Sequence, residues 1–574
     1  MDTPWLNHYE ANVPPSLTYS TATLPSLLDA AVAHNPNAVA INFVLKYVLK
    51  GRVALGGKLS YRQLSEAVDR FATALHALGV RKGDRVALML PNTPQFVIGF
   101  FGALRLGAIV VNINPTYTPR ELKLQLADSG AETILVLSRF LPKINEIRAE
   151  TALRRVIVTD IFDPLPFPVS AVVRRAQQKE ADWVDVQPNA TTLLFSDLLA
   201  DYAATPPPVE VDAHDVALFQ YTGGTTGAPK AAMLTHYNVM ANTTQILNWV
   251  PSMRHGRERV VCAIPFFHVY GMTVGMCVAL ALASQMIIIP DPRPVDIVME
   301  AIHNEKATIF PGVPALYIAI INHKNVTDYD LRSVTVCISG SAALPMEVQE
   351  KFGEITGGRL VEGYGLTEAA PVTHCNPVFG TRKSGAIGLP MPDVEVQVLD
   401  LETDEPLPIG SEREGELLLR APQIMKGYWN RDDETAKVLS ADGWLRTGDI
   451  VRTDADGYFY VVDRKKDLII ASGYNIVPRE VEEVLFMHPS VLEAAVAGIP
   501  DQYRGETVKA FVVLKPAAQA TTKELRDFCK ANLAPYKVPT HVEFLAELPK
   551  TQVGKVLRRV LVEMEKQKQA QDRD

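Results

Sequence analysis

The sequence predicts an α/β protein: a large N-terminal domain of mostly parallel, helix-covered sheets, an antiparallel β subdomain, and a small α+β domain at the C-terminus. Three observations support this fold class. Short apolar runs alternate with amphipathic segments through most of residues 85–365, as in parallel sheets covered by helices. Short alternating strands follow from Val394. The chain has 574 residues, far more than one hydrophobic core accommodates.

The first sheet is predicted from five consecutive segments. Strands are expected at 85–90 (RVALML), 108–115 (AIVVNINP) and 131–137 (AETILVL). Helices are expected between them at 93–107 and 118–130, and the second has a threonine cap and a terminal glycine. The same βαβα order recurs over 260–365.

Two stretches depart from this rhythm. Residues 159–208 are rich in proline and read as loops around a short basic-amphipathic helix at 171–183, which is either a surface helix or a membrane-surface contact. Residues 269–290 carry no formal charge and have about the length of a bilayer span. We expect a buried helix running into a buried strand there, because Ser284 and Gln285 interrupt the run before MIIIP.

The C-terminal part is predicted as antiparallel strands followed by a small α+β domain. Strands are expected at 394–400, 415–420, 457–462, 467–472, 491–500 and 509–516. Helices are expected at 478–491, with proline in the first turn, and at 522–533. The polar tail at 565–574 is expected to fray.

Charge and cysteine content exclude several classes. The net charge is −8 and no basic run is long enough for a nucleic-acid footprint. The five cysteines, which lack metal-ligand spacing, indicate reduced, buried thiols in a cytoplasmic protein: Cys262, Cys277, Cys337, Cys375 and Cys529. The polar, acidic N-terminus is not a signal peptide.

The stretch YTGGTTGAPKAAMLTH (221–236) predicts a phosphate-binding loop after a strand. Glycines let backbone N–H groups approach phosphate oxygens, threonine hydroxyls donate further hydrogen bonds, and Lys230 adds a charge. It is not a Walker A loop, because Ala228 and Pro229 separate Gly227 from Lys230 and Ala231 follows. The alternative is a surface turn.

Three distant segments add compatible chemistry. In VEGYGLTEAAP, Tyr364 can stack on a purine and Glu368 can bind Mg²⁺. In WLRTGDI, Asp449 can accept both hydroxyls of a ribose. In LPKTQVGKVLRR, Lys555 follows a glycine. Each segment alone is an ordinary turn.

Together these motifs resemble the acyl- and aryl-adenylating superfamily, which includes acyl-CoA synthetases, firefly luciferase and the adenylation domains of peptide synthetases. The resemblance extends from about Leu24 to Arg559 and is strongest to bacterial long-chain fatty acid–CoA ligases. It rests on GAPKAAMLTHYNV, VEGYGLTEAAPVTHCNP, WLRTGDI, VDRKKDLIIASGYNI and LPKTQVGKVLRR, in the family's order.

The resemblance implies a site for ATP, Mg²⁺ and an acyl group. The loop would wrap the β- and γ-phosphates through Thr222, Gly223, Gly224, Thr225, Thr226, Gly227 and Lys230. Thr225 and Glu368 would hold Mg²⁺. Tyr364 would lie against the adenine, and Gly340 and Ser341 would form another wall of that pocket. Gly363, Gly365 and Thr367 would also bind ATP or AMP. Asp449 and Arg464 would fix the ribose, Lys555 would reach the α-phosphate and the attacking carboxylate, and His268 would sit where acyl chain, nucleotide and thiol meet.

The resemblance also implies two half-reactions and a mobile lid. The N-terminal domain, 1–465, would carry the ATP and acyl site, and the C-terminal lid domain, 466–574, would rotate about a hinge at Lys466. Rotation would withdraw Lys555 and bring in Gly473, whose lack of a side chain would let the pantetheine arm of coenzyme A pass.

The expected function is a long-chain fatty acid–CoA ligase that uses ATP, Mg²⁺ and coenzyme A. PFFHVYGMTV has no acid to pair with a substrate amine, which disfavours amino acids. Two alternatives stay open: an aryl- or medium-chain acid–CoA ligase, and a fatty acyl-AMP ligase that loads a carrier protein. A catalytically silent nucleotide-binding protein is the alternative of a different class. Analogy allows a homodimer and peripheral contact with the inner face of the membrane.

Overall fold

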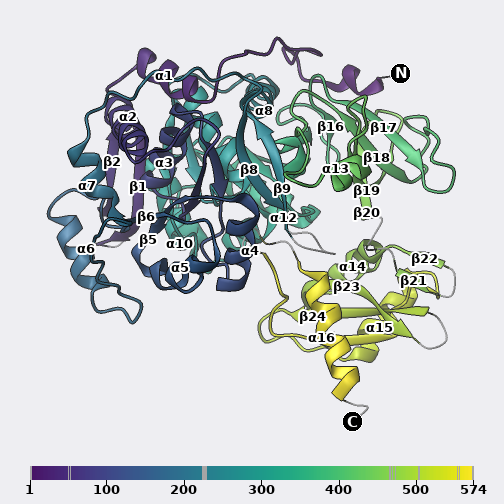
Figure 1. The fold of residues 1–574 in the computed structure, drawn as a ribbon. Helices are drawn as coiled ribbons and strands as arrows, with labels where there is room; N and C mark the ends of the chain where they lie inside the picture. The colour runs from purple at the N-terminus through teal and green to yellow at the C-terminus, as the bar shows by residue number, and fades with distance from the viewer. Residues whose placement is uncertain are drawn as a thin grey trace. The chain divides into compact units, whose positions relative to one another are not determined.

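The computed structural model describes residues 3–49, 51, 53–222, 229–464, 467, 469–471, 474–501, 505–551, 554 and 556–571 (Figure 1). The chain divides into two compact units. One comprises His8–Glu395 and Arg420–Leu445, and the other comprises Met1–Asn7, Val396–Leu419 and Arg446–Asp574. The boundary at 465/466 expected from the sequence stays a prediction.

The first unit contains a seven-stranded sheet in the order β7-β6-β5-β3-β4-β8-β9. Its strands are β3 (Arg85–Met89), β4 (Ile109–Asn112), β5 (Thr133–Leu137), β6 (Arg155–Thr159), β7 (Thr192–Leu194), β8 (Val216–Thr222) and β9 (Lys230–Thr235). Neighbours pair in parallel from β7 to β8, and only β8 and β9 are antiparallel. The parallel order predicted for residues 85–137 is therefore confirmed.

Helix ends around this sheet follow the local sequence. In α3 (Pro94–Arg105), the Thr93 side chain accepts a hydrogen bond from the Phe96 N–H. In α4 (Pro119–Ser129), Thr118 and Glu121 form a capping box, and the helix ends at Gly130 with a φ of 63°. Apolar side chains of α4 and α5 (Leu141–Ile147) pack against the strands.

A nine-stranded sheet in the same unit has the order β16-β15-β14-β13-β12-β10-β11-β1-β2. Its strands are β1 (Val39–Val48), β2 (Val53–Ser60), β10 (Arg259–Cys262), β11 (Gln285–Ile288), β12 (Ile309–Gly312), β13 (Val336–Ser339), β14 (Arg359–Gly365), β15 (Val372–Cys375) and β16 (Leu389–Pro390). The central pairs are parallel, and β2, β15 and β16 add antiparallel edges.

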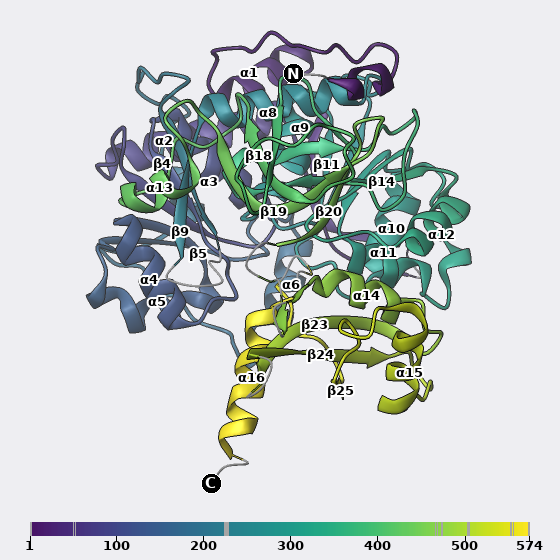
Figure 2. The same cartoon turned by 90° about the vertical axis from the view of Figure 1, so that its right-hand side faces the viewer.

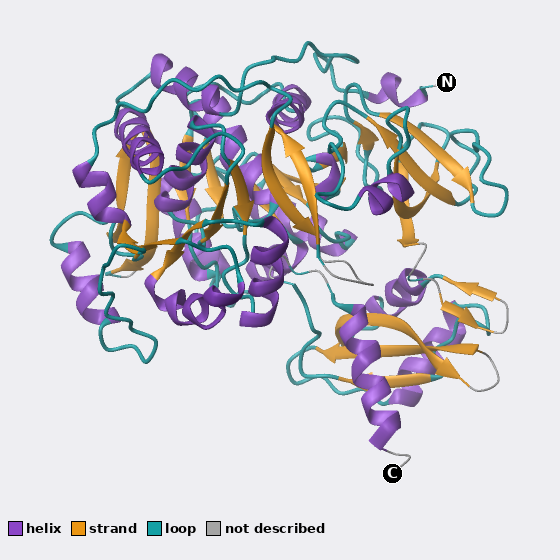
Figure 3. Cartoon of the chain, viewed as in Figure 1, coloured by secondary structure: helices purple, strands orange, loops and turns teal. Residues whose placement is uncertain are grey.

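Helices surround the strands of both sheets, as Figure 3 shows. α10 (Asp296–Glu305), α11 (Pro314–Ile321) and α12 (Met346–Thr356) share one apolar cluster with the nine-stranded sheet, and Figure 2 shows them grouped near β14. The other long helices of the unit are α1 (Pro25–His34), α2 (Tyr61–Ala77) and α8 (His236–Trp249).

The uncharged stretch at 269–290 folds as predicted. A π-helical turn, η4 (Gly271–Cys277), runs into α9 (Val278–Ala281) and then into β11. Nearly all of its side chains are buried. Within the described part of the chain, no helix combines the length and apolarity needed to cross a bilayer.

The proline-rich segment at 159–208 has more structure than predicted. The expected helix is present as α6 (Val169–Gln177), which buries none of its residues. The sequence interpretation missed β7, which extends the seven-stranded sheet beside β6, and α7 (Phe195–Asp201). Both are short, and burial of Phe195 and Leu198 holds α7 in place.

The second unit contains a four-stranded sheet, and each of the four strands lies wholly or largely in that unit. The strands are β17 (Glu395–Asp400), β18 (Gly415–Arg420), β19 (Leu445–Thr453) and β20 (Phe459–Arg464), in that order. β19 and β20 are antiparallel, as expected.

The C-terminal sheet comprises β21 (Ile469–Ala471), β22 (Tyr474–Ile476), β23 (Val491–Asp501), β24 (Gly505–Leu514) and β25 (His541–Phe544). Side chains of α14 (Pro478–Phe486) and α15 (Thr522–Asn532) share one apolar cluster with it, and Leu561 of α16 (Arg558–Gln571) belongs to another. The prediction that the tail frays from residue 565 is wrong, because α16 continues through Gln571. One anchor is Lys509 on β24, which is buried and forms ion pairs with Glu543 (2.8 Å) and Glu565 (2.5 Å).

Candidate active site

The predicted phosphate loop closes a β-hairpin. β8 ends at Thr222, β9 begins at Lys230, and these two residues are paired across the antiparallel ladder. Gly223, Gly224, Thr225, Thr226 and Gly227 lie outside the described residues. Lys230 therefore opens a strand, whereas a Walker A lysine opens a helix. This topology agrees with the rejection of a Walker A loop from the sequence.

Lys230 is held by two side chains that the sequence interpretation did not identify. Its Nζ forms an ion pair with Glu434 on α13 (Asp432–Val438) and lies 5.3 Å from the centroid of the Tyr428 ring. Hydrogen bonds from Lys230 and then Lys437 lower the pKa of Glu434 to about 2. Glu434 is therefore ionised at every pH at which the protein would work.

Glu368, the predicted metal ligand, contacts the same tyrosine. It lies in η6 (Thr367–Ala369), directly after β14, and its Oε1 accepts a 2.8 Å hydrogen bond from the Tyr428 hydroxyl. Tyr428 is buried, with 6% of its surface exposed. One tyrosine thus joins the predicted metal ligand to the predicted phosphate ligand.

Several residues predicted to bind ATP or AMP meet at one sheet edge. Gly340 and Ser341 follow β13, while Gly363 and Tyr364 end β14, and these two strands pair in parallel. Because carboxyl ends of parallel strands share an edge, the two segments lie side by side. Ser341 has a φ of 71°, the left-handed conformation that side chains rarely adopt and that concentrates at functional sites.

The turn after β14 has a strict steric requirement. A Cβ atom on Gly365 would lie 1.9 Å from the Pro371 carbonyl oxygen, so no other residue fits without backbone movement. Thr367, also predicted to bind ATP or AMP, begins η6. The Tyr364 ring meets the His374 ring edge-on, with centroids 5.8 Å apart.

His268 lies in the loop that follows β10 in the nine-stranded sheet. Its Nδ1 accepts a hydrogen bond from the Tyr270 N–H (3.2 Å), so the proton of the neutral ring belongs on Nε2. The neighbouring Phe267 carbonyl accepts a 2.9 Å hydrogen bond from Gln220, two residues before Thr222 on β8. The histidine loop is therefore tied to the strand that leads into the phosphate hairpin.

The chain beyond His268 is apolar and contains no acid. Val269, Met272, Val274 and Val278 are buried along the π-helical turn and α9. π-Helical turns are rare and occur frequently at functional sites. This environment suits a hydrocarbon better than an ammonium group.

Mg²⁺ fits this donor set when phosphate is present. Among the described residues, no group of three or more His, Cys, Asp or Glu could hold a metal ion by itself. Mg²⁺ usually takes only one or two protein carboxylates and completes its octahedron with water and substrate phosphates. Glu368, which accepts the Tyr428 hydrogen bond, would supply one such carboxylate.

The second unit carries the predicted ribose ligands. Asp449 on β19 is buried, its N–H donates to Thr447 Oγ1 (3.0 Å), and it stands opposite Arg464 on β20. The register thus brings these two predicted residues together. Lys466, Gly473 and Lys555 lie outside the described residues.

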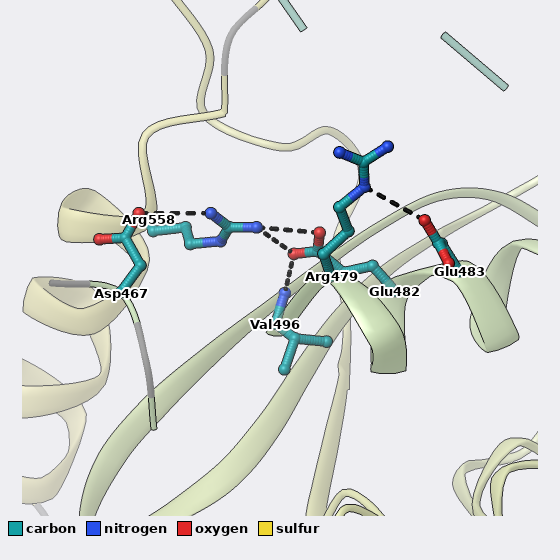
Figure 4. A network of polar contacts seen from close by, with 6 residues as sticks. All are labelled: Asp467, Arg479, Glu482, Glu483, Val496 and Arg558. Atoms are coloured by element: carbon teal, nitrogen blue, oxygen red, sulfur yellow. Dashed lines mark hydrogen bonds and ion pairs between the residues drawn. The ribbon is translucent and has the colours of Figure 1, made fainter. Parts of the chain in front are cut away.

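A polar network joins residues that lie close in sequence to the predicted hinge and to the predicted catalytic lysine (Figure 4). Arg558, three residues after Lys555, donates to both carboxylate oxygens of Glu482 (2.9 Å each) and lies 3.4 Å from Asp467. Glu482 also accepts the Val496 N–H (2.7 Å). The first turn of α16 is therefore fixed to α14, to β23 and to the residue after Lys466.

Comparison with known proteins identifies the family of this chain. Residues 28–429 match the family model of the AMP-binding enzymes, and residues 480–555 match that of the AMP-binding enzyme C-terminal domain. The chain belongs to the AMP-binding enzyme family.

Relatives of this AMP-binding enzyme align over nearly its whole length. It is 45% identical to the long-chain-fatty-acid–CoA ligase of Bacillus subtilis (strain 168), over 98% of both chains. It is 39% identical to the ligase of the same name from Escherichia coli O6:H1, over 97% of both.

Solved structures show the same fold. The enzyme matches the anthranilate CoA ligase AuaEII in complex with anthranoyl-AMP with a TM-score of 0.83 and 28% identity, covering 96% of this chain and 99% of that one. It matches ATP-bound MatB from Rhodopseudomonas palustris with a TM-score of 0.81 and 28% identity, covering 95% and 99%. The predicted superfamily and fold class are confirmed.

Proposed function

We propose that the protein is a long-chain fatty acid–CoA ligase that converts ATP, a fatty acid and coenzyme A to acyl-CoA, AMP and diphosphate through an acyl-adenylate. The observation that carries the proposal is the cluster of Lys230, Tyr428 and Glu368, together with the hydrogen bond that ties the His268 loop to β8, in a chain whose full-length relatives bear this name.

In the first half-reaction, a carboxylate oxygen attacks the α-phosphorus of ATP and diphosphate leaves. Lys230 and the hairpin donors neutralise charge on the leaving phosphates, and Glu368 with Thr225 would hold the Mg²⁺ that screens them. Lys555 neutralises the attacked phosphate and the carboxylate. Asp449 and Arg464 fix the ribose, and Tyr364 lies against the adenine.

In the second half-reaction, the coenzyme A thiol attacks the acyl carbon and AMP leaves. His268 presents an Nε2 proton because Tyr270 occupies its Nδ1, so it can donate to the oxygen on which charge develops. Rotation of residues 466–574 about Lys466 withdraws Lys555 and admits the pantetheine arm past Gly473.

The substrate proposal rests on the buried apolar side chains after His268 and on the absence of an acid there. The test is a series of acids assayed for ATP-dependent AMP release: saturated acids of rising length, an aryl acid and an amino acid. Each is run with coenzyme A or with a carrier protein as acceptor. Highest kcat/KM for long chains with coenzyme A supports the proposal.

Three other outcomes contradict it. A preference for aryl or medium-chain acids, or for a carrier protein, selects one of the alternative ligases. Absence of AMP release with every acid, and of diphosphate exchange in a parallel assay, indicates a catalytically silent nucleotide-binding protein.

We also propose peripheral contact with an anionic lipid surface through α6 and the residues before it. Phe167 is 84% exposed and Val172 is 61% exposed. Arg175 lies about one turn beyond Val172 in α6, and Lys179 follows the end of the helix, so insertion of apolar side chains would combine with attraction to lipid phosphates.

Co-sedimentation with vesicles that contain phosphatidylglycerol tests this contact. Phe167→Ser combined with Val172→Ser should abolish binding, whereas Met346→Ser, at a position 55% exposed elsewhere on the same unit, should not. Equal binding by both variants would contradict the assignment. A homodimer and a cytoplasmic location stay predictions; light scattering of the purified chain tests the first.

A further inference from the structure

The chain from Met425 to Trp429 is attached to the strand that carries Lys230. Lys426 N–H donates to the Met233 carbonyl (2.9 Å), Met233 N–H donates to the Gly427 carbonyl (2.9 Å), and Trp429 N–H donates to the Ala231 carbonyl (2.9 Å). The segment therefore continues the edge of the seven-stranded sheet next to β9, and its position relative to Lys230 is fixed by main-chain hydrogen bonds.

The same segment is attached to the metal-ligand turn. Met425 N–H donates to the carbonyl of Glu368 (2.8 Å), and Tyr428 donates to its carboxylate. α13 follows within a few residues, and its first turn brings Glu434 to Lys230. Glu434 thus contacts Lys230 from a segment whose preceding residues, 425–429, are hydrogen-bonded both to β9 and to Glu368.

Lys230 is therefore paired with a carboxylate of the protein itself, that of Glu434. Its side chain is 28% exposed and that of Glu434 is 26% exposed, so the pair is open to an incoming ligand. Lys437 contacts the other carboxylate oxygen of Glu434 and can retain it when Lys230 departs. A phosphate that approaches Lys230 must compete with a carboxylate for the same ammonium group.

We propose that Glu434 is a resident counter-ion of the phosphate site, which ATP displaces from Lys230 on binding, so that Glu434 weakens the affinity for ATP. The inference rests on the proposed role of Lys230 as a phosphate ligand. It predicts a gain of affinity on mutation, which structural damage does not produce.

The experiment measures the Kd of a non-hydrolysable ATP analogue, with methylene between the α- and β-phosphorus atoms, by calorimetry with Mg²⁺ on the full chain. Glu434→Gln should lower the Kd about two- to fivefold, the range of a partly exposed ion pair. The difference should shrink in high salt, because screening weakens both attractions.

Two controls isolate the contact. Asp433→Asn removes the same charge from the exposed neighbouring residue and should leave the Kd near that of the wild type. In a Lys230→Ala background, Glu434→Gln should have no effect, because the competition is absent. An equal gain from Asp433→Asn would mean a general charge effect and would overturn the inference.

The outcomes separate this inference from the proposed function. An unchanged or higher Kd for Glu434→Gln, in a protein that activates fatty acids, overturns the inference alone. A lower Kd in a protein that activates no acid supports the inference and overturns the ligase function. A wild-type protein that binds no analogue overturns both.

Discussion

Replacing Tyr428 with phenylalanine removes one hydroxyl and leaves the ring beneath Lys230. The lost hydrogen bond joins a buried hydroxyl to a carboxylate at 2.8 Å. Hydrogen bonds to charged groups contribute about 1.5–3 kcal/mol, and the lower end applies because Glu368 is only half-buried and water can replace the hydroxyl. About 1.4 kcal/mol corresponds to a factor of ten in an equilibrium constant. If the hydroxyl orients Glu368 for Mg²⁺, the Mg²⁺ concentration for half-maximal activity should rise roughly tenfold.

The assay is AMP release at saturating ATP and fatty acid over a Mg²⁺ titration. Tyr221→Phe is the matched control, since the Tyr221 hydroxyl also donates to a carboxylate, Asp128, at 2.8 Å, and the residue is similarly buried. Both variants should lose a comparable amount of thermal stability, and only Tyr428→Phe should need more Mg²⁺. Identical Mg²⁺ titrations for the two variants would refute the positioning role.

Three further predictions concern catalysis, acid stability and backbone sterics. Lys555→Ala should abolish adenylation but spare thioester formation from a supplied acyl-adenylate; equal loss of both half-reactions would contradict the lid mechanism. Burial lowers the pKa of His236 to about 4, so the unfolded chain binds a proton at this residue at a higher pH than the folded protein does. The contribution of the neutral histidine to the free energy of unfolding should be fully present above about pH 6.5 and should fall by up to roughly 3 kcal/mol as the pH approaches 4. His236→Asn should flatten the melting temperature over that range, and an unchanged slope would argue against this histidine. Gly365→Ala should destabilise the unit by about 3 kcal/mol or more, because its Cβ meets backbone, whereas Gly353→Ala, whose Cβ has its nearest neighbour at 3.6 Å, should be neutral or stabilising in thermal unfolding.

The parts of the fold that the sequence predicted are those with local physical signals. Thr93, Thr118 and Gly130 mark helix ends because each satisfies or permits a terminal backbone conformation next to itself. The interruption at Ser284 and Gln285 separated helix from strand in the uncharged stretch, where length alone suggested a membrane span. The short β7 and α7 carried too few residues for a periodic pattern.

The parts of the site that the sequence missed depend on contacts between distant segments. Tyr428 is 60 residues from Glu368, and Glu434 is 204 residues from Lys230. The acidic run that includes Glu434 predicts only the start of a helix, because acidic side chains in the first turn interact favourably with the helix dipole. The hydrogen bonds of residues 425–429 to β9 bring Tyr428 and Glu434 to Lys230, and no sequence pattern near Tyr428 predicts these hydrogen bonds.

The buried ammonium group of Lys509 limits how far this protein can be truncated from its C-terminus. A chain cut between Glu543 and Glu565 would leave the buried Lys509 ammonium with Glu543 as the remaining one of these two acidic partners, and would also remove part or all of α16. An affinity tag belongs after Gln571 for the same reason, because Glu565 of α16 provides a negative charge to the buried Lys509.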